Sequence, residues 1–319
     1  MDVHEQPGER AKRVMTHGRR DNRGMADEDV RDLTMRRPDG RTVAWTESGA
    51  GTPVLRIPGT PGCRWAIRGD RTPWHERELR MITTERPGFG ASTTLPGRGY
   101  AEHAHDLAAL LDHLGLDSVP VIGTSGGAPH LLAFAALHPD RVLAATVLVG
   151  AAPVDEDEVA AMIALNAQAH QMVRVDDLEG LRTLLGPVRQ AILADPLAGI
   201  RDVMAHAPEE DQQIMDDAVW QRALARGLRE ALESGLDGWL DETIAVIRPW
   251  ADFDVADVLT SVTWWHGQGD RNVPLSAARR LVDKLPTATL HVWAEAGHLT
   301  PYKREGEILD ELLARAAAG

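Results

Sequence analysis

Short runs of apolar and β-branched residues alternate along the chain with longer stretches in which leucine recurs at helical spacing. The short runs predict strands because each is bounded by turn residues and rich in valine, isoleucine, threonine or tryptophan. From Arg41 onward the predicted strands are TVAWTE, PVLRIP, LRMITTE, SVPVIG, LAATVLVG, SVTWWHG and ATLHVWA. Strands that alternate with helices in this way favour a mainly parallel sheet with helices on both faces.

Two helices in the first half of the chain follow from the same pattern. Between Tyr100 and Gly115 the leucines at positions 107, 110, 111 and 114 share one helical face, and the glycine marks the end of the helix. A second helix is predicted directly after Ser125, through PHLLAFAALH. The first of these is interpreted as a crossover helix between neighbouring strands.

The pattern changes from about Val154 to Trp250. Acidic stretches rich in alanine and leucine, such as DEDEVAAMIALNAQAHQ, contain no convincing strand. This predicts a helical cap over residues 154–250, inserted into an α/β core formed by residues 27–153 and 251–319. The strand and helix alternation resumes at about Thr260 and ends in a C-terminal helix, EGEILDELLARAAA.

Residues 1–26 carry charge throughout and show no apolar periodicity, which predicts a disordered extension. A short surface helix is the alternative, and Met25 is an alternative natural start. The segment has no apolar core of a secretory signal, and the single cysteine, Cys63, fits a reducing compartment. A cytoplasmic protein is therefore expected.

The charge balance narrows the choice of partners. The chain has 48 acidic and 34 basic residues, a formal net charge of −14, which disfavours nucleic acid and anionic lipid. No apolar run approaches the roughly 18 residues that a membrane span requires. A small-molecule substrate is the expected partner, and the oligomeric state stays open.

Ser125 lies in the segment GTSGG, directly after the apolar run SVPVI and before a predicted helix. A glycine-x-serine-x-glycine match is weak by itself, but a strand-to-helix turn forces such a serine outward at the end of a sheet. Side chains at Gly123 or Gly127 would crowd this turn. The following helix directs its N-terminal amides toward the serine, so the amide of Gly126 is the natural donor to an oxyanion.

A reactive serine needs a histidine to accept its proton and a carboxylate to orient that histidine. Asp270 follows the predicted strand SVTWWHG, and His298 follows the last predicted strand, ATLHVWA. Loops after parallel strands leave the same edge of the sheet, so both residues are expected to meet Ser125 there. Serine, aspartate, histidine is also the chain order that this architecture requires.

These motifs resemble the α/β-hydrolase superfamily, in its branch with a serine nucleophile and a helical cap, from about Thr42 to the C-terminus. The blocks that carry the resemblance are PGTPG, ERPGFGAS, GTSGG, HGQGDRNVP and AGH. The resemblance implies that Ser125 is the nucleophile, Asp270 the acid and His298 the base. It also implies that the loop after the second predicted strand gives a second oxyanion donor, the amide of Thr60.

Two positions depart from the family's usual pattern. Pro58 and Gly59 stand where family members usually carry histidine and glycine. Proline removes one backbone donor and stiffens the loop, whereas the amide of Thr60 stays available. Glu85 stands where the family has an aspartate in the block ERPGFG, and we interpret it as structural.

Competing assignments exist for the candidate catalytic groups. Asp155 and Glu295 are alternative acids, because one follows a strand end and the other lies near the predicted base. Cys63, beside the predicted oxyanion loop, is an alternative nucleophile that lacks the strained turn. The alternative role of Asp270 is that of an ordinary turn residue. The alternative for Ser125 is that the turn has been retained but is catalytically inactive.

The cap is expected to enclose a modest apolar pocket, with Trp65, His130, Trp220 and Trp239 as candidates for its lining. The leading hypothesis is hydrolysis of a small, mostly apolar ester, thioester or lactone through an acyl-enzyme. The same triad supports lyase, carbon–carbon hydrolase, perhydrolase or cofactor-free biosynthetic chemistry, or a protein that binds a small molecule without turnover. The histidines show no metal-ligand spacing, so neither a metal nor another cofactor is expected.

Overall fold

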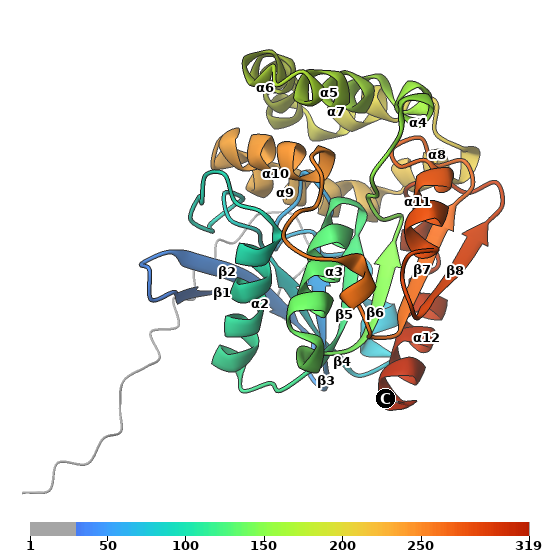
Figure 1. The fold of residues 1–319 in the computed structure, drawn as a ribbon. Helices are drawn as coiled ribbons and strands as arrows, with labels where there is room; N and C mark the ends of the chain where they lie inside the picture. The colour runs from blue at the N-terminus through green and yellow to red at the C-terminus, as the bar shows by residue number, and fades with distance from the viewer. Residues whose placement is uncertain (1–29, 319) are drawn as a thin grey trace, which may run out of the picture.

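The described chain forms a curved sheet with helices on both faces and a further group of helices above the carboxyl ends of the strands (Figure 1). The structure is a computed structural model that describes residues 30–318. The predicted disordered extension at residues 1–26 lies outside the described residues.

Within residues 30–318, eight strands pair in the order β1-β2-β4-β3-β5-β6-β7-β8. The strands β1 and β2 are antiparallel to their neighbours, and the remaining pairs are parallel. The strands are β1 (Val30–Arg36), β2 (Thr42–Ser48), β3 (Thr52–Ile57), β4 (Leu79–Thr84), β5 (Val119–Thr124), β6 (Val142–Leu148), β7 (Val262–Gly267) and β8 (Ala288–Trp293). The predicted mainly parallel α/β fold is confirmed.

One strand, β1, was not predicted from the sequence. Its residues VRDLTMR carry charges at three positions and do not alternate strictly between apolar and polar. The strand lies at the edge of the sheet and pairs only with β2, so most of its side chains face solvent. An edge strand with charged side chains lacks the apolar run by which buried strands are recognised.

The two faces of the sheet are covered by different helices. On one face, α2 (Tyr100–Leu114), α3 (Ala128–Leu137) and α11 (Leu275–Val282) pack their apolar residues against the central strands. On the other face, α12 (Glu305–Ala318) and the short α1 (Thr72–His75) contribute Ile308, Leu309 and Trp74. Strands β5 and β6 are almost fully buried because both of their faces are covered.

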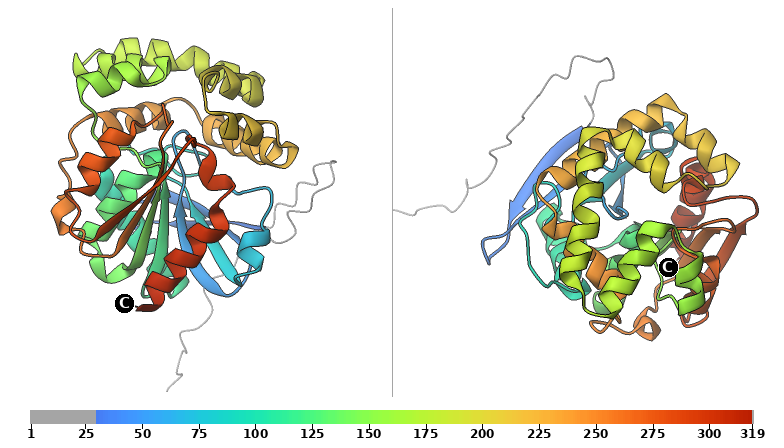
Figure 2. Two further views of the ribbon diagram at one scale, coloured as in Figure 1. Left: turned by 90° about the vertical axis from the view of Figure 1, so that its right-hand side faces the viewer. Right: turned by 90° about the horizontal axis from the view of Figure 1, so that it is seen from above.

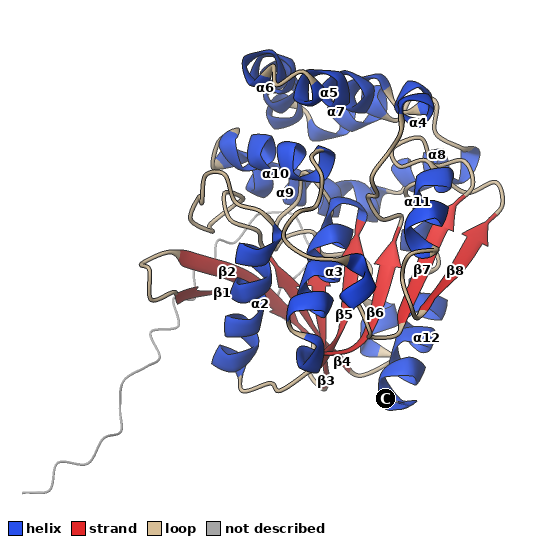
Figure 3. Cartoon of the chain, viewed as in Figure 1, coloured by secondary structure: helices blue, strands red, loops and turns tan. Residues whose placement is uncertain are grey.

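Between β6 and β7 the described chain forms helices and loops without a strand (Figure 3). We call these helices, α4 to α10, the inserted helices. They are α4 (Glu156–Ala161), α5 (Ala164–Arg174), α6 (Leu178–Ala194), α7 (Pro196–Val203), α8 (Glu209–Met215), α9 (Ala218–Glu233) and α10 (Asp237–Ile247). In both side views they lie across the carboxyl ends of the strands (Figures 1 and 2).

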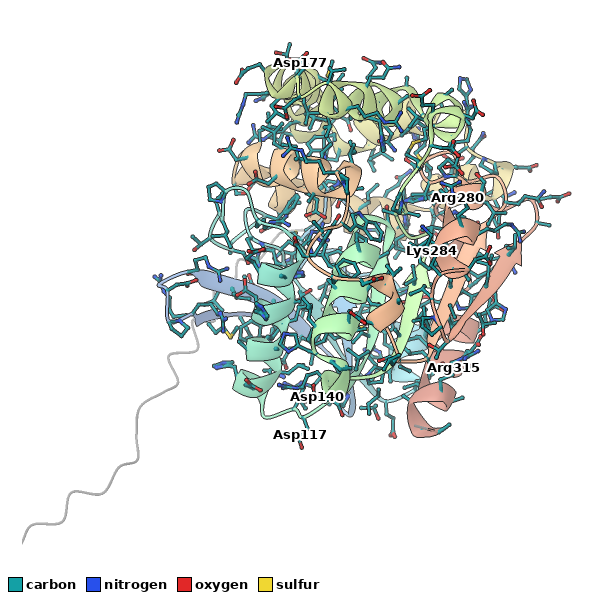
Figure 4. The ribbon with its side chains drawn as sticks, viewed as in Figure 1. Asp117, Asp140, Asp177, Arg280, Lys284 and Arg315 are labelled. Atoms are coloured by element: carbon teal, nitrogen blue, oxygen red, sulfur yellow. The ribbon has the colours of Figure 1, made fainter. Side chains whose placement is uncertain are left out.

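Charged side chains mark the outside of this arrangement. Asp117 and Asp140 lie at the end of the molecule opposite the inserted helices and point outward. Asp177 lies at the top, beside α6 (Figure 4). All three are exposed.

None of the helices described between residues 30 and 318 is both long and apolar enough to pass through a lipid bilayer.

Candidate active site

Ser125 lies at the sharp turn between β5 and α3. The strand ends at Thr124, a single 3-10 turn covers Ser125–Gly127, and α3 begins at Ala128. The backbone of Ser125 has φ of 50°, a left-handed conformation that is unfavourable for a residue with a side chain. The turn therefore holds this serine in the strained geometry that the segment GTSGG predicts.

The glycines around Ser125 are required by space. A β-carbon at Gly123 would lie 2.9 Å from the carbonyl oxygen of Gly127, and one at Gly127 would lie 2.4 Å from that of Ile57. A β-carbon at Gly59 would lie 3.2 Å from the β-carbon of Ser125. The loop after β3 thus passes directly over the serine turn.

Loops from three strands bring Ser125, His298 and Asp270 together. Nε2 of His298 lies 3.1 Å from Oγ of Ser125, and Nδ1 of His298 lies 2.7 Å from Oδ2 of Asp270. The second oxygen of Asp270 accepts hydrogen bonds from the amides of Asn272 at 2.8 Å and Val273 at 3.0 Å. The carboxylate is therefore fixed from both sides and orients the imidazole toward the serine.

The charges of this pair favour proton transfer to the histidine. Burial opposes charge on His298, but the carboxylate of Asp270 and its hydrogen bond outweigh burial and raise the pKa of His298. Burial likewise opposes ionisation of Asp270, yet the charge of His298 and its hydrogen bond hold the pKa of Asp270 below its usual value. An imidazolium formed during proton transfer would thus be stabilised where it forms.

The two predicted oxyanion donors lie next to each other. A β-carbon at Gly126 would lie 2.2 Å from Oγ1 of Thr60 and 3.5 Å from its backbone nitrogen. Both residues line the same cavity as Ser125 and His298. Within the described part of the chain, the amide of Thr60 makes no hydrogen bond, so it is free to bind an oxyanion.

The loop that carries Thr60 is held by Arg86, from the block ERPGFG. The guanidinium of Arg86 donates to the carbonyl oxygens of Pro58 and Gly59, the second at 2.7 Å, and to Oγ1 of Thr60 at 3.2 Å. Arg86 is fully buried. The proline at position 58 therefore stands in a loop whose carbonyl groups, rather than its amides, are fixed by a side chain.

A cavity of about 310 Å³ lies between Ser125 and the inserted helices. Its walls are mainly apolar side chains from α5, α6, α7 and α9, among them Leu165, Val188, Ile192, Ile200 and Leu224. A few polar groups interrupt them, including Asn166, His170, Thr243, Asn272 and Tyr302. Such a lining suits a compact, mostly apolar ligand.

Of the four residues predicted to line a pocket, Trp220 and Trp239 line this cavity, and the other two do not. Trp65 is buried beside it, with the guanidinium of Arg226 3.4 Å from its ring centre. His130 is fully buried below the cavity and bonds Oε1 of Glu242 at 3.0 Å. The sequence placed His130 on the correct helix, but it points into the protein interior.

The competing candidates lie in other surroundings. Asp155 caps the N-terminus of α4 by accepting from the amide of Glu158 at 2.9 Å, and Glu295 is exposed. Cys63 is fully buried, and burial raises the pKa of its thiol well above the usual value. Glu85 is buried and accepts from Arg64 and from the amides of residues 91 and 92 at 2.7–2.8 Å, which is a structural role.

Three residues near the site were not singled out from the sequence. His170 lines the cavity, and burial lowers its pKa to about 4. Glu242 on α10 and Asp211 on α8 are carboxylates with no exposed surface. Both lie in acidic stretches whose charges normally face solvent, so the pattern carries no signal for their burial.

Comparison with known proteins identifies the family of the fold. The sequence model of the alpha/beta hydrolase fold family matches residues 52–304. A 2-hydroxy-6-oxo-2,4-heptadienoate hydrolase of Pseudomonas putida is 29% identical over 262 residues, which cover 78% of this chain and 83% of that protein. A 2-hydroxymuconate semialdehyde hydrolase of Pseudomonas sp. strain CF600 is 28% identical over 287 residues, 85% of this chain and 90% of that protein.

Solved structures share the fold at lower identity. An esterase from Thermogutta terrifontis superposes with a TM-score of 0.64 at 21% identity, covering 90% of this chain and 99% of that chain. A bromoperoxidase from Bacillus anthracis superposes with a TM-score of 0.64 at 19% identity, covering 89% and 99%. At these identities the likeness concerns the fold alone.

Proposed function

The chain belongs to the alpha/beta hydrolase fold family, and from that premise we propose that it is a serine hydrolase of a small, mostly apolar ester, thioester or lactone. The observation that carries the proposal is the continuous hydrogen-bonded series from Ser125 through His298 to Asp270, at the floor of an apolar cavity. The reaction proceeds through an acyl-enzyme.

In the proposed mechanism, Oγ of Ser125 attacks the carbonyl carbon while its proton passes to Nε2 of His298. The amides of Thr60 and Gly126 bind the oxyanion of the tetrahedral intermediate. His298 then gives the proton to the leaving group, which departs. A water molecule, activated in turn by His298, attacks the acyl-serine and releases the acid. Asp270 stabilises the imidazolium in both halves of the reaction.

The lining of the cavity supports a neutral substrate. Arg68 is the only arginine or lysine along the described walls, and its guanidinium already donates to Glu305 and to the carbonyl oxygen of Tyr302 at 2.8 Å. A carboxylate in this cavity would be left without a free cation, which is costly in an apolar environment. In this proposal residues 154–250 act as a cap that selects the substrate.

The curated relatives support a second candidate, hydrolysis of a carbon–carbon bond. They are named as hydrolases of 2-hydroxy-6-oxo-dienoates and of 2-hydroxymuconate semialdehyde. A keto-dienoate has no ester, so its hydrolysis must break a bond between carbons. The Ser125, His298 and Asp270 arrangement is compatible with that chemistry, whereas the lack of a free cation in the described walls weighs against a carboxylate substrate.

Two measurements test the proposal. A fluorophosphonate should label wild-type protein at Ser125 and leave Ser125→Ala unlabelled, and absence of labelling would remove the nucleophile. In the same buffer, kcat/KM is compared for nitrophenyl esters of increasing chain length and for 2-hydroxy-6-oxo-2,4-heptadienoate. The best ester is expected to exceed the dienoate by more than about a hundredfold, because the dienoate must bury an unpaired carboxylate. The reverse order would favour the second candidate.

A further inference from the structure

Helix α8, one of the inserted helices, contacts the loop that carries His298. Asp211 lies in this helix, far from His298 in the sequence, and has no exposed surface. Its Oδ2 accepts a hydrogen bond from the amide of Leu299 at 3.1 Å. A carboxylate from the inserted helices thus binds the backbone immediately after the histidine.

The backbone before His298 is held from the same side. The amide of Gly297 donates to Oγ1 of Thr300 at 3.2 Å, and that hydroxyl lies 3.4 Å from Oδ1 of Asp211. A β-carbon at position 297 would lie 2.3 Å from Oδ2 of Asp211, so this approach requires the glycine. Asp211 therefore bonds the residue after the histidine directly and packs closely against the glycine before it, where the single hydroxyl proton of Thr300 is shared between Asp211 and Glu210.

Other contacts fasten α8 to the same segment. Glu210 lies 3.2 Å from Oγ1 of Thr300 and 3.6 Å from the guanidinium of Arg304. Nζ of Lys303 donates to Gln213 at 3.0 Å. Ile214 and Met215 of α8 pack in one apolar cluster with Leu299. The helix and the histidine loop are thus joined by buried apolar contacts and by polar contacts that are exposed or partly buried.

We propose that Asp211 is a positioning residue, which aligns the imidazole of His298 with Ser125 by fixing the backbone on both sides of it from an inserted helix. This inference rests on the proposed function, since it assigns His298 the role of base. The histidine is then correctly oriented only when α8 is docked, so a change in the inserted helices would alter the chemical step as well as substrate binding.

Electrostatics around the imidazole are consistent with this role. The titratable groups that face His298 are Asp270 and His266 from the β7 segment and Asp211 from α8, with Glu210 behind Thr300. Burial lowers the pKa of His298 because it opposes the charged form. The carboxylate of Asp270 outweighs this effect, and the carboxylate of Asp211 raises the pKa further. Asp211 itself is buried, which raises its pKa, while the amide of Leu299 opposes that rise.

The test separates the hydrogen bond from the charge. Asp211→Asn keeps an oxygen that accepts from Leu299 but removes the charge, whereas Asp211→Ala removes both. Glu209→Gln, an exposed carboxylate on the same helix, is the matched control. In Asp211→Ala, kcat for a short nitrophenyl ester should fall by about tenfold to a hundredfold, as expected for a misplaced catalytic group, with KM nearly unchanged. Asp211→Asn should keep most of the kcat that Asp211→Ala loses. It should also lower the pKa of His298, which is measured by NMR titration of the ring protons of His298.

Two results would overturn the inference: kcat of Asp211→Ala within twofold of the Glu209→Gln control, or ring-proton signals and a pKa of His298 in Asp211→Ala that match those of the control. If Asp211→Ala does not fold, Thr300→Val replaces it, since valine keeps the shape and removes the bond to Gly297. The NMR titration reports on His298 without any turnover. It therefore tests this inference even if the fluorophosphonate fails to label Ser125, which would refute the proposed function instead.

Discussion

His130 on α3 and Glu242 on α10 meet in a site without solvent exposure, where Nε2 of the histidine lies 3.0 Å from Oε1 of the glutamate. Arg86 lies 3.4 Å from the same carboxylate, and Arg98 donates to its other oxygen. Burial opposes ionisation of Glu242, but the charges of Arg86, His130 and Arg98 hold its pKa well below the usual range. One helix of the insertion is thus joined to the arginine that holds the loop of Thr60.

Glu242→Gln should destabilise the protein by about 3 to 5 kcal/mol, because it leaves two buried guanidinium groups without their counter-charge. Guanidinium chloride unfolding followed by circular dichroism measures the effect. Asp237→Asn, at the exposed start of the same helix, is the control, with an expected change below about 0.5 kcal/mol. A loss no larger than that of the control would show that the buried charges are compensated by other groups.

Asp270→Asn should reduce turnover of a nitrophenyl ester by about 10⁴, because the amide favours the wrong tautomer of His298. Ser125→Ala should remove about three to six orders of magnitude of turnover and leave the fold intact. Asp155→Asn serves as the control for the competing acid, since Asp155 caps α4 and is partly exposed. A larger loss from Asp155→Asn than from Asp270→Asn would move the acid to the earlier strand.

The sequence was sufficient for the sheet from β2 to β8, but not for β1, and it was sufficient for the candidate groups at the carboxyl ends of the strands. The apolar runs of β5, β6 and β7 are buried on both faces, which makes them recognisable without tertiary information. Ser125 directly follows β5, Asp270 lies three residues after β7, and His298 lies five residues after the edge strand β8, so the topology brings the three loops together. Local pattern therefore predicts these positions well.

Contacts between the inserted helices and the rest of the fold could not be predicted from the local sequence pattern. Asp211 and Glu242 have acidic neighbours that are exposed or half-buried, and nothing in the local pattern distinguishes the fully buried carboxylate from the others. Their partners, Leu299 and Arg86, are distant in the sequence. The direction in which His130 points likewise depends on Glu242, which lies 112 positions further along the chain. Such pairings are decided by packing.

His170 should make stability sensitive to acid. Burial, with a smaller contribution from Arg174, lowers the pKa of His170 to about 4, whereas the unfolded chain keeps about 6.5. The unfolded state therefore binds more protons between these values, so the stability is fully present above pH 6.5 and is lost as the pH falls toward 4. The loss from this one group amounts to about 2 kcal/mol at pH 5.

Urea unfolding at pH 7.5 and pH 5 measures this dependence in the wild type and in His170→Leu. The variant should lose about 2 kcal/mol less stability over the interval, since leucine does not titrate. His206→Gln, which changes an exposed histidine, should keep the wild-type slope. Equal slopes for His170→Leu and the wild type would mean that His170 takes up its proton without cost in the folded state.

The last prediction concerns the division between chemistry and substrate choice. Trp220 on α9 and Trp239 on α10 line the cavity above Ser125, and both belong to the inserted helices. Replacing either one with alanine enlarges the wall that faces the acyl chain, and Trp220 also packs in the apolar cluster of Leu299, the residue after His298. Each variant should therefore shift the preferred ester toward longer acyl chains and raise KM for short ones by about tenfold to a hundredfold. Labelling of Ser125 by a small phosphonate should be nearly unchanged.

Trp65→Ala is the matched control, because Trp65 is an equally large buried tryptophan beside the cavity that does not line it. All three substitutions should cost stability of about 3 to 5 kcal/mol, as large-to-small changes in a core do. Only Trp220→Ala and Trp239→Ala should alter the chain-length profile, measured as kcat/KM across nitrophenyl esters. The same shift in Trp65→Ala would mean that loosened packing, rather than the wall of the cavity, sets the preference. Loss of phosphonate labelling in a folded Trp220→Ala would instead be due to the apolar cluster that Trp220 shares with Leu299, and it would support the positioning role proposed for α8.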